Sequence, residues 1–227
     1  MQHIQTFSRD WNHDEWLYTF TQEWPVPGLA HQLSYTLAYE RTGGVSKPAD
    51  MLVNYRYQLL GDAEAKVACT PRLSLILPTG DPKAGTGNGS VGVQAEIAVS
   101  TVLGKRWVAH TNVGGTVVPS ARDAAGQKAT TRSVNLGQSF IWQTTNRFNV
   151  MLESVWSRSE SVAGEGRTAR QDSFLVSPGI RWAYNYPSGL QIVPGVAFPF
   201  GVGPSAGQKS VFFYLSFEGP VWKPRGS

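Results

Sequence analysis

The chain has 227 residues, of which 41% are hydrophobic and only 16% are charged, against roughly 25% charged residues in ordinary soluble domains. No stretch reaches the run of about 18 apolar residues that a membrane-spanning helix needs, so a helical membrane protein is excluded. The net charge of +4 comes from lysines and arginines that are scattered singly, and this excludes a nucleic-acid-binding face.

Segments in which apolar and polar residues alternate follow one another along the whole chain, a pattern that predicts strands. A short strand at 3–7 begins the series, and strands at 15–23 and 32–41 follow it. The remaining strands are predicted at 52–59, 65–77, 90–101, 106–118, 133–143, 148–158, 173–184, 190–200 and 210–218.

The alternation is clearest at 90–101 and 106–118. Val93 and Ile97 share one face of the first of these strands, whereas Gln94 and Glu96 share the other. Because the side-chain period of a strand is two residues, one face of the sheet is apolar and the other is polar. In a transmembrane barrel the apolar row faces lipid and the polar row faces the lumen.

The links between the strands alternate in length. Short links fall at 24–28, 60–62, 103–105, 144–146 and 185–188, and long polar links fall at 42–48, 78–89, 119–130, 159–171 and 201–209. Short periplasmic turns on one rim and long extracellular loops on the other are typical of bacterial outer-membrane barrels. The glycine-rich residues 85–89 are expected to form a mobile loop.

These patterns predict an all-β protein: a single antiparallel up-and-down transmembrane β-barrel of about twelve strands over residues 1–219, with 220–227 as a C-terminal tail. Its expected location is the bacterial outer membrane, although no signal peptide is visible. Outer-membrane lipid and the outer-membrane assembly machinery are the expected partners, and no oligomeric state is predicted. Aromatic residues near strand ends are expected to form a lipid-facing belt, and they are Trp107, Trp142, Trp156, Trp182 and Tyr184.

The polar row predicts the residues that line the lumen. They are Glu40, Arg56, Arg72, Gln94, Glu96, His110, Asn112, Glu153, Arg181 and Glu218. Because the positive and negative charges nearly cancel, the row could form ion pairs across the bore or steer a small polar or charged solute along it.

Catalytic and cofactor sites are not predicted. His110 and Asn112 share one face of a strand, but no serine stands at a spacing that identifies a nucleophile. The single cysteine, Cys69, allows neither an internal disulfide nor a cysteine metal cluster. The glycine-rich residues 85–89 lack the lysine and the following helix of a phosphate-binding loop.

Three segments carry a family resemblance. They are RLSLILPTGD at 72–81, VGVQAEIAVS at 91–100 and LGKRWVAHTNVG at 103–114, with a glycine-rich loop between the first two. The chain resembles the outer-membrane transporters of the MetA phenol-degradation pathway. The resemblance implies a barrel of this size through which small molecules, aromatic or otherwise hydrophobic ones among them, pass or bind.

Three alternatives stay open at the level of sequence. The first is a non-conducting structural or assembly barrel, plugged by inner arginine–glutamate pairs or by an inward-folded loop such as 78–89. The second is an outer-membrane enzyme, and the third is a soluble barrel that binds a ligand.

Overall fold

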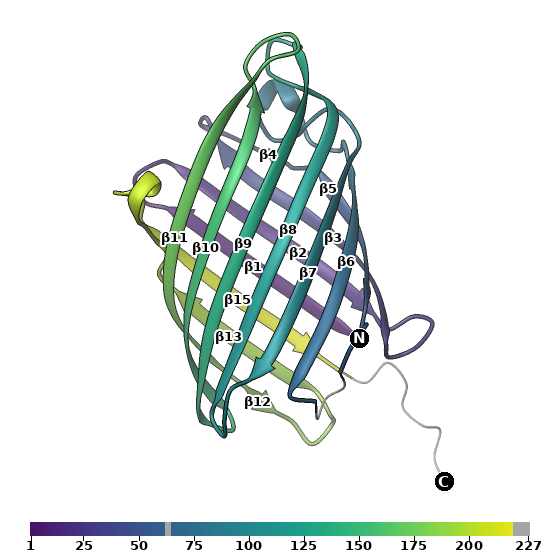
Figure 1. Cartoon of the computed structure of the whole chain (residues 1–227), viewed down its shortest axis with the longest axis vertical. Helices are drawn as coiled ribbons and strands as arrows, with labels where there is room; N and C mark the ends of the chain where they lie inside the picture. The colour runs from purple at the N-terminus through teal and green to yellow at the C-terminus, as the bar shows by residue number, and fades with distance from the viewer. Residues whose placement is uncertain (62–64, 220–227) are drawn as a thin grey trace.

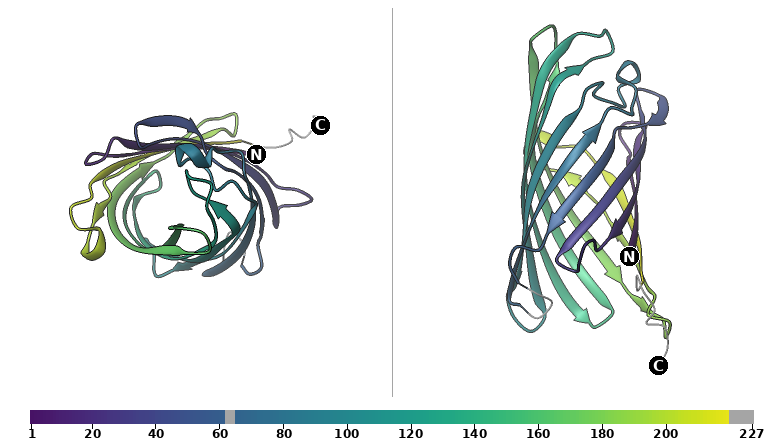
Figure 2. Two further views of the ribbon diagram at one scale, coloured as in Figure 1. Left: turned by 90° about the horizontal axis from the view of Figure 1, so that it is seen from above. Right: turned by 90° about the vertical axis from the view of Figure 1, so that its right-hand side faces the viewer.

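The computed structural model describes residues 1–61 and 65–219. Within these residues, twelve antiparallel strands close into one barrel (Figure 1), as the sequence predicts. Seen from above, the strands form a ring (Figure 2). The ring closes because β1 pairs with both β2 and β15, while β13 pairs with both β15 and β11. The predicted tail at 220–227 and the end of the predicted turn at 60–62 lie outside the described residues.

The barrel strands agree closely with the predicted ones. They are β1 (Gln2–Asp10), β2 (Glu15–Trp24), β3 (His31–Thr42), β5 (Met51–Tyr57), β6 (Val67–Leu77), β7 (Gly92–Val102), β8 (Trp107–Arg122), β9 (Lys128–Thr145), β10 (Phe148–Val162), β11 (Thr168–Trp182), β13 (Gln191–Ala197) and β15 (Ser210–Glu218). Three short segments extend this wall, namely β4 (Val45–Pro48), β12 (Tyr184–Asn185) and β14 (Phe200–Gly201). The 3₁₀ helices are η1 (Pro82–Ala84) and η2 (Gly203–Ser205), and no helix in the described ranges has the length and apolar character needed to cross a membrane.

The two rims differ as the link lengths predict. Both ends of the barrel sequence meet at one rim, where the terminal amine of Met1 donates a hydrogen bond of 2.9 Å to the Gly219 carbonyl oxygen. The turns after β2, β7 and β9 lie at this rim, which we call the turn end (Figure 1). The loop that contains η1 and the loop that contains η2 lie at the opposite rim, the loop end.

Two predicted long loops are largely strand. Pairing of β8 with β9 continues to Arg122 opposite Lys128, and pairing of β10 with β11 continues to Val162 opposite Thr168. The prediction that 119–130 and 159–171 are loops was therefore wrong over most of their length. The reason is that polar strands can pair above the membrane, where alternation with apolar residues is not required. These two hairpins reach furthest at the loop end (Figure 1).

Charged side chains support this extension. The Arg158 guanidinium donates hydrogen bonds of 2.7 and 3.0 Å to the two Asp172 carboxylate oxygens, and Arg170 Nε lies 3.0 Å from Glu160 Oε1. Each pair joins β10 to β11, and opposite charges across an antiparallel pair stabilise it by roughly 0.2–1 kcal/mol.

Two smaller differences concern the first strands. The first strand runs from Gln2 to Asp10 and is not the short strand predicted at 3–7. The predicted link at 42–48 is mostly the β3–β4 hairpin, which turns at Gly43 and Gly44 with φ values of 55° and 81°. Glycine suits such positive φ values because it has no Cβ.

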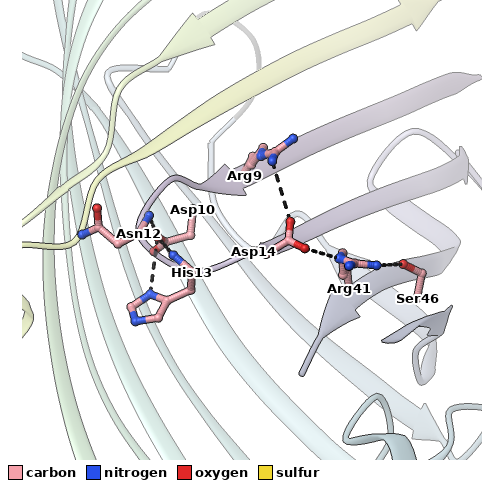
Figure 3. Close-up of polar contacts among 7 residues, drawn as sticks. All are labelled: Arg9, Asp10, Asn12, His13, Asp14, Arg41 and Ser46. Carbon is pink, nitrogen blue, oxygen red and sulfur yellow. Dashed lines mark hydrogen bonds and ion pairs between the residues drawn. The ribbon is translucent and has the colours of Figure 1, made fainter. Parts of the chain in front are cut away.

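Polar contacts stabilise the loop end of β1, β2 and β3 (Figure 3). Asp10 Oδ1 accepts hydrogen bonds from the backbone N–H groups of Asn12 and His13, at 2.7 and 3.1 Å, and so shapes the β1–β2 turn. Asp14 Oδ2 lies 2.7 Å from Arg41 Nε on β3, so the turn is also joined to its neighbour across the ladder.

Exposure distinguishes the inner face of the wall from the outer face. In a closed barrel, side chains on the concave side converge and cover one another, and those on the convex side splay apart. Ile97 and Val113 lie opposite each other and are each 53% exposed, whereas Asn54 and Ser74 lie opposite each other and are 4% and 3% exposed. The apolar row therefore faces outward, and the polar row faces inward.

The loop between β6 and β7 has a fixed internal structure. The buried Asp50 carboxylate accepts hydrogen bonds from Gly80 N at 2.9 Å and from both Asn88 N and Asn88 Nδ2 at 2.8 Å. Gly87 approaches it so closely that an added Cβ would lie 2.8 Å from Asp50 Oδ1. A carboxylate distant in the sequence thus organises the glycine-rich residues that were predicted to form a mobile loop, and a local sequence pattern cannot show this contact.

Asp50→Asn is expected to loosen this loop, because an amide nitrogen would then face donors in place of one carboxylate oxygen. Each buried donor left without an acceptor costs about 1–3 kcal/mol. Trypsin should then cut after Lys83 in the folded barrel faster than it cuts the wild type. Lys47→Gln, which removes the half-exposed Lys47–Asp81 ion pair, is the control and should change the rate little. Equal rates for Asp50→Asn and the wild type would contradict this account.

Candidate solute passage

Inner polar side chains of β6, β7 and β8 form one network. Pairing places Arg56 opposite Arg72, and Arg72 opposite Glu96. Arg72 Nη2 donates to the Glu96 carboxylate and, at 3.4 Å, to Gln94 Oε1. Gln94 Nε2 in turn lies 3.2 Å from Thr116 Oγ1. The Arg72 charge is thus balanced within the wall.

At the loop end of this same wall, apolar side chains pack together. Ile76, Val118 and Ala121 are buried in one cluster, against which Leu52 and Val162 pack. Gly92 leaves the space for it, since a Cβ there would lie 2.8 Å from Val118 Cγ2 and 3.2 Å from Ile76 Cδ1.

His110 makes a contact that the sequence pattern does not reveal. Its Nδ1 lies 2.7 Å from Ser100 Oγ, because Ser100 and His110 face each other across the β7–β8 ladder. A hydrolytic triad also needs a third group that orients the histidine. Among the described residues no hydrogen bond to His110 Nε2 is present, so this serine–histidine pair lacks that group. Asn112 lies opposite Ala98 and Gly137 on the same inner face.

The inner face of the barrel also holds a series of cavities. The central cavity, of about 280 Å³, lies against β10, β11, β13 and β15. Glu153 and Arg181 are its charged residues, and the rest of its lining is apolar or small. This lining also includes Met151, Ser177, Gly179, Ile180, Gly195, Val196, Ala197, Phe212 and Tyr214.

Three further cavities continue from the central one. A loop-end cavity is lined by Asp10, Glu15, Glu40 and Phe212 among others. A lower cavity is lined by Asn149, Arg181, Gln191, Tyr214 and Glu218 among others. A turn-end cavity is lined by Gln2, Glu23, Gln32, Arg56 and Glu218 among others.

Shared residues join these cavities in sequence. Phe212 lines both the loop-end and the central cavity, and Arg181 and Tyr214 line both the central and the lower cavity. Glu218 lines both the lower and the turn-end cavity. The series therefore runs from the loop end, past β11, β13 and β15, to a turn-end cavity that β2, β3 and β5 also line.

The predicted belt residues all lie on the outer row, at two heights. Trp107 and Trp142 face each other at the turn end and stack with ring centroids 6.1 Å apart. Trp182 and Tyr184 are paired with Phe148 and Ile192 near the same rim. Trp156 lies in the loop-end half of β10, where the Arg158 guanidinium stands 5.7 Å from the centre of its ring. We propose that the rings at the turn end mark one membrane interface.

Several residues of the cavities were missed by the sequence reasoning. Met151, Ala197, Phe212 and Tyr214 line the central cavity. They carry no charge, and charged or amide side chains are the usual signal of a polar lumen. The alternation of β15 carries the missing signal, because Phe213 on the outer face requires Phe212 and Tyr214 on the inner one.

Within residues 1–61 and 65–219, no group of three or more His, Cys, Asp or Glu side chains is placed to hold a metal ion. Cys69 is a free thiol that lies opposite Val99 on the outer row.

Comparisons with known proteins agree with this architecture. The family described as "Putative MetA-pathway of phenol degradation" matches residues 12–217. Among solved structures, the NanC porin has a TM-score of 0.62 at 7% identity, over 96% of this chain and 100% of its own. The COG4313 outer membrane channel from Pseudomonas putida F1 has a TM-score of 0.62 at 12% identity, over 95% of this chain and 91% of its own. These likenesses show the barrel fold. No curated protein matches the sequence.

Proposed function

Because the chain belongs to the family named for the MetA pathway of phenol degradation and has the fold of outer-membrane channels, we propose that it lets small solutes, aromatic ones among them, cross the bacterial outer membrane. The observation that carries the proposal is the series of four cavities that share lining residues from the loop end to the turn end.

The lining suits molecules that are partly apolar and partly charged. The loop-end cavity carries the carboxylates of Asp10, Glu15 and Glu40. The loop-end cavity also holds the Arg41 cation. The central cavity has one carboxylate, Glu153, and one cation, Arg181, and most of its remaining lining is apolar. A solute moving inward would therefore meet polar, then mixed, then polar surroundings. Such an arrangement holds a small molecule weakly at several places, and weak binding at several places favours passage over capture.

Electrical recording tests the proposal directly. Purified barrel is inserted into planar bilayers, and its conductance in KCl is measured together with the entry of small sugars and aromatic acids into liposomes. We expect stepwise conductance and accelerated solute entry. Insertion, established by heat-modifiable migration on gels, without either activity would defeat the proposal.

A second function is favoured by a separate observation. The Arg72–Glu96 pair and the apolar cluster around Ile76 and Val118 fill the inner side of one wall. A barrel filled in this way could act as a structural or assembly component that does not conduct. The same recordings distinguish the two functions, because this second one requires insertion with no measurable current.

A further inference from the structure

The Arg181 side chain occupies the junction between an apolar and a polar part of the bore. It lines the central cavity together with Met151 and Phe212, and it lines the lower cavity together with Asn149 and Glu218. Pairing places it opposite Gly195 on β13. A Cβ on Gly195 would lie 3.6 Å from both Arg181 Cβ and Tyr214 Cβ. Because Gly195 has no side chain, a gap is left between the side chains of Arg181 and Tyr214.

Arg181 also differs from Arg72, the inner arginine that forms an ion pair. Arg72 is bound to Glu96 and Gln94. In the part of the chain that the structure describes, no carboxylate lies within ion-pair distance of Arg181 and no hydrogen bond is made by its guanidinium. A guanidinium is a planar fork of donors that matches a carboxylate in two parallel hydrogen bonds. An unpaired one beside an apolar cavity is therefore suited to an anionic group that carries an apolar body.

We propose that Arg181 binds the carboxylate of small aromatic acids, and that the aromatic ring then lies against Met151, Ala197 and Phe212 in the central cavity. This inference rests on the proposed function and names the solute class for it. Glu153 lines the same cavity and repels a carboxylate. The carboxylate of the bound acid therefore lies at the part of the cavity that Arg181 lines. The ring can contact Phe212 and Met151, since aromatic and thioether groups both pack favourably against it.

Block of the ion current by matched small molecules tests the inference. Benzoate has both the ring and the charge, benzamide has the ring without the charge, and acetate has the carboxylate without the ring. We expect benzoate to reduce the KCl current of the wild-type barrel at lower concentrations than either of the other two. Arg181→Gln should remove the difference between benzoate and benzamide, and Arg181→Lys should keep part of it. Arg158→Gln, which removes a cation from the outer face, is the matched control and should keep the difference.

Binding is also measured without conduction. The fluorine resonance of 4-fluorobenzoate should broaden in the presence of detergent-solubilised wild-type barrel, and should broaden much less with Arg181→Gln that migrates as a folded barrel on gels. If the barrel conducts and benzoate and benzamide block the current equally, the inference is overturned and the proposed function stands. Broadening that depends on Arg181 in a barrel that never conducts would uphold the inference and defeat the proposed function. Equal broadening by both proteins would overturn the inference as well.

Discussion

Ile97→Arg is expected to lower the free energy of unfolding of the barrel in lipid by about 2–4 kcal/mol, the cost of an arginine on the lipid face near the bilayer midplane. Ile97 lies in the middle of β7, and its side chain is 53% exposed on the outer face beside Val113. Hydrocarbon cannot replace the water that hydrates the guanidinium. Denaturant unfolding of the barrel in lipid vesicles, followed by tryptophan fluorescence, measures the change.

Ala98→Arg is the matched control, because Ala98 is the next residue of the same strand and faces inward beside Asn112. The added cation can reach water in the lumen, so the loss of stability should be small, and the ion selectivity of the bore should shift toward anions. The two rows would be assigned to the wrong faces if Ile97→Arg left the stability unchanged and the Ala98→Arg barrel failed to fold.

Ala197→Trp is expected to reduce conductance severalfold, because the indole would fill much of the central cavity. Ala197 lies on β13 opposite Gly179, which has no side chain to compete for the space, and both residues line the cavity. Pore width sets how fast ions and solutes pass a constriction. Single-channel recording in KCl gives the size of the reduction.

Ala95→Trp supplies the comparison, since Ala95 lies on the exposed outer face of β7 and takes the same substitution without narrowing the bore. Its conductance should equal that of the wild type. An unchanged current in Ala197→Trp would mean that ions do not follow the β11–β13–β15 wall, and the proposed route would have to be abandoned.

The barrel itself could be predicted because strand alternation is a local signal. Val93 and Gln94 differ in polarity at adjacent positions, and the same contrast recurs in strand after strand. The lengths of β8 to β11 could not be predicted, because above the membrane the outer face becomes polar and the alternation disappears. There, pairs such as Arg158 with Asp172 hold the strands together, and only the register brings them opposite each other.

The candidate site was predictable in part for the same reason. Parity alone identified the inner position of Arg181, but it could not show that Arg181 lacks an ion pair while Arg72 has one. The contact between Ser100 and His110 needs two strands in register. Asp50 organises a loop that begins about thirty residues later in the chain, and no local pattern reports such a contact.

The measurement that tests the central claim most directly is the chemical accessibility of single cysteines in the barrel reconstituted in lipid. In a Cys69→Ala background, Glu96→Cys, Asn112→Cys, Ile97→Cys and Val113→Cys are exposed to a charged, water-soluble thiol reagent. We predict rapid modification at 96 and 112, which face the lumen, and protection at 97 and 113, which face hydrocarbon. Modification at 97 and 113 with protection at 96 and 112 would contradict the account.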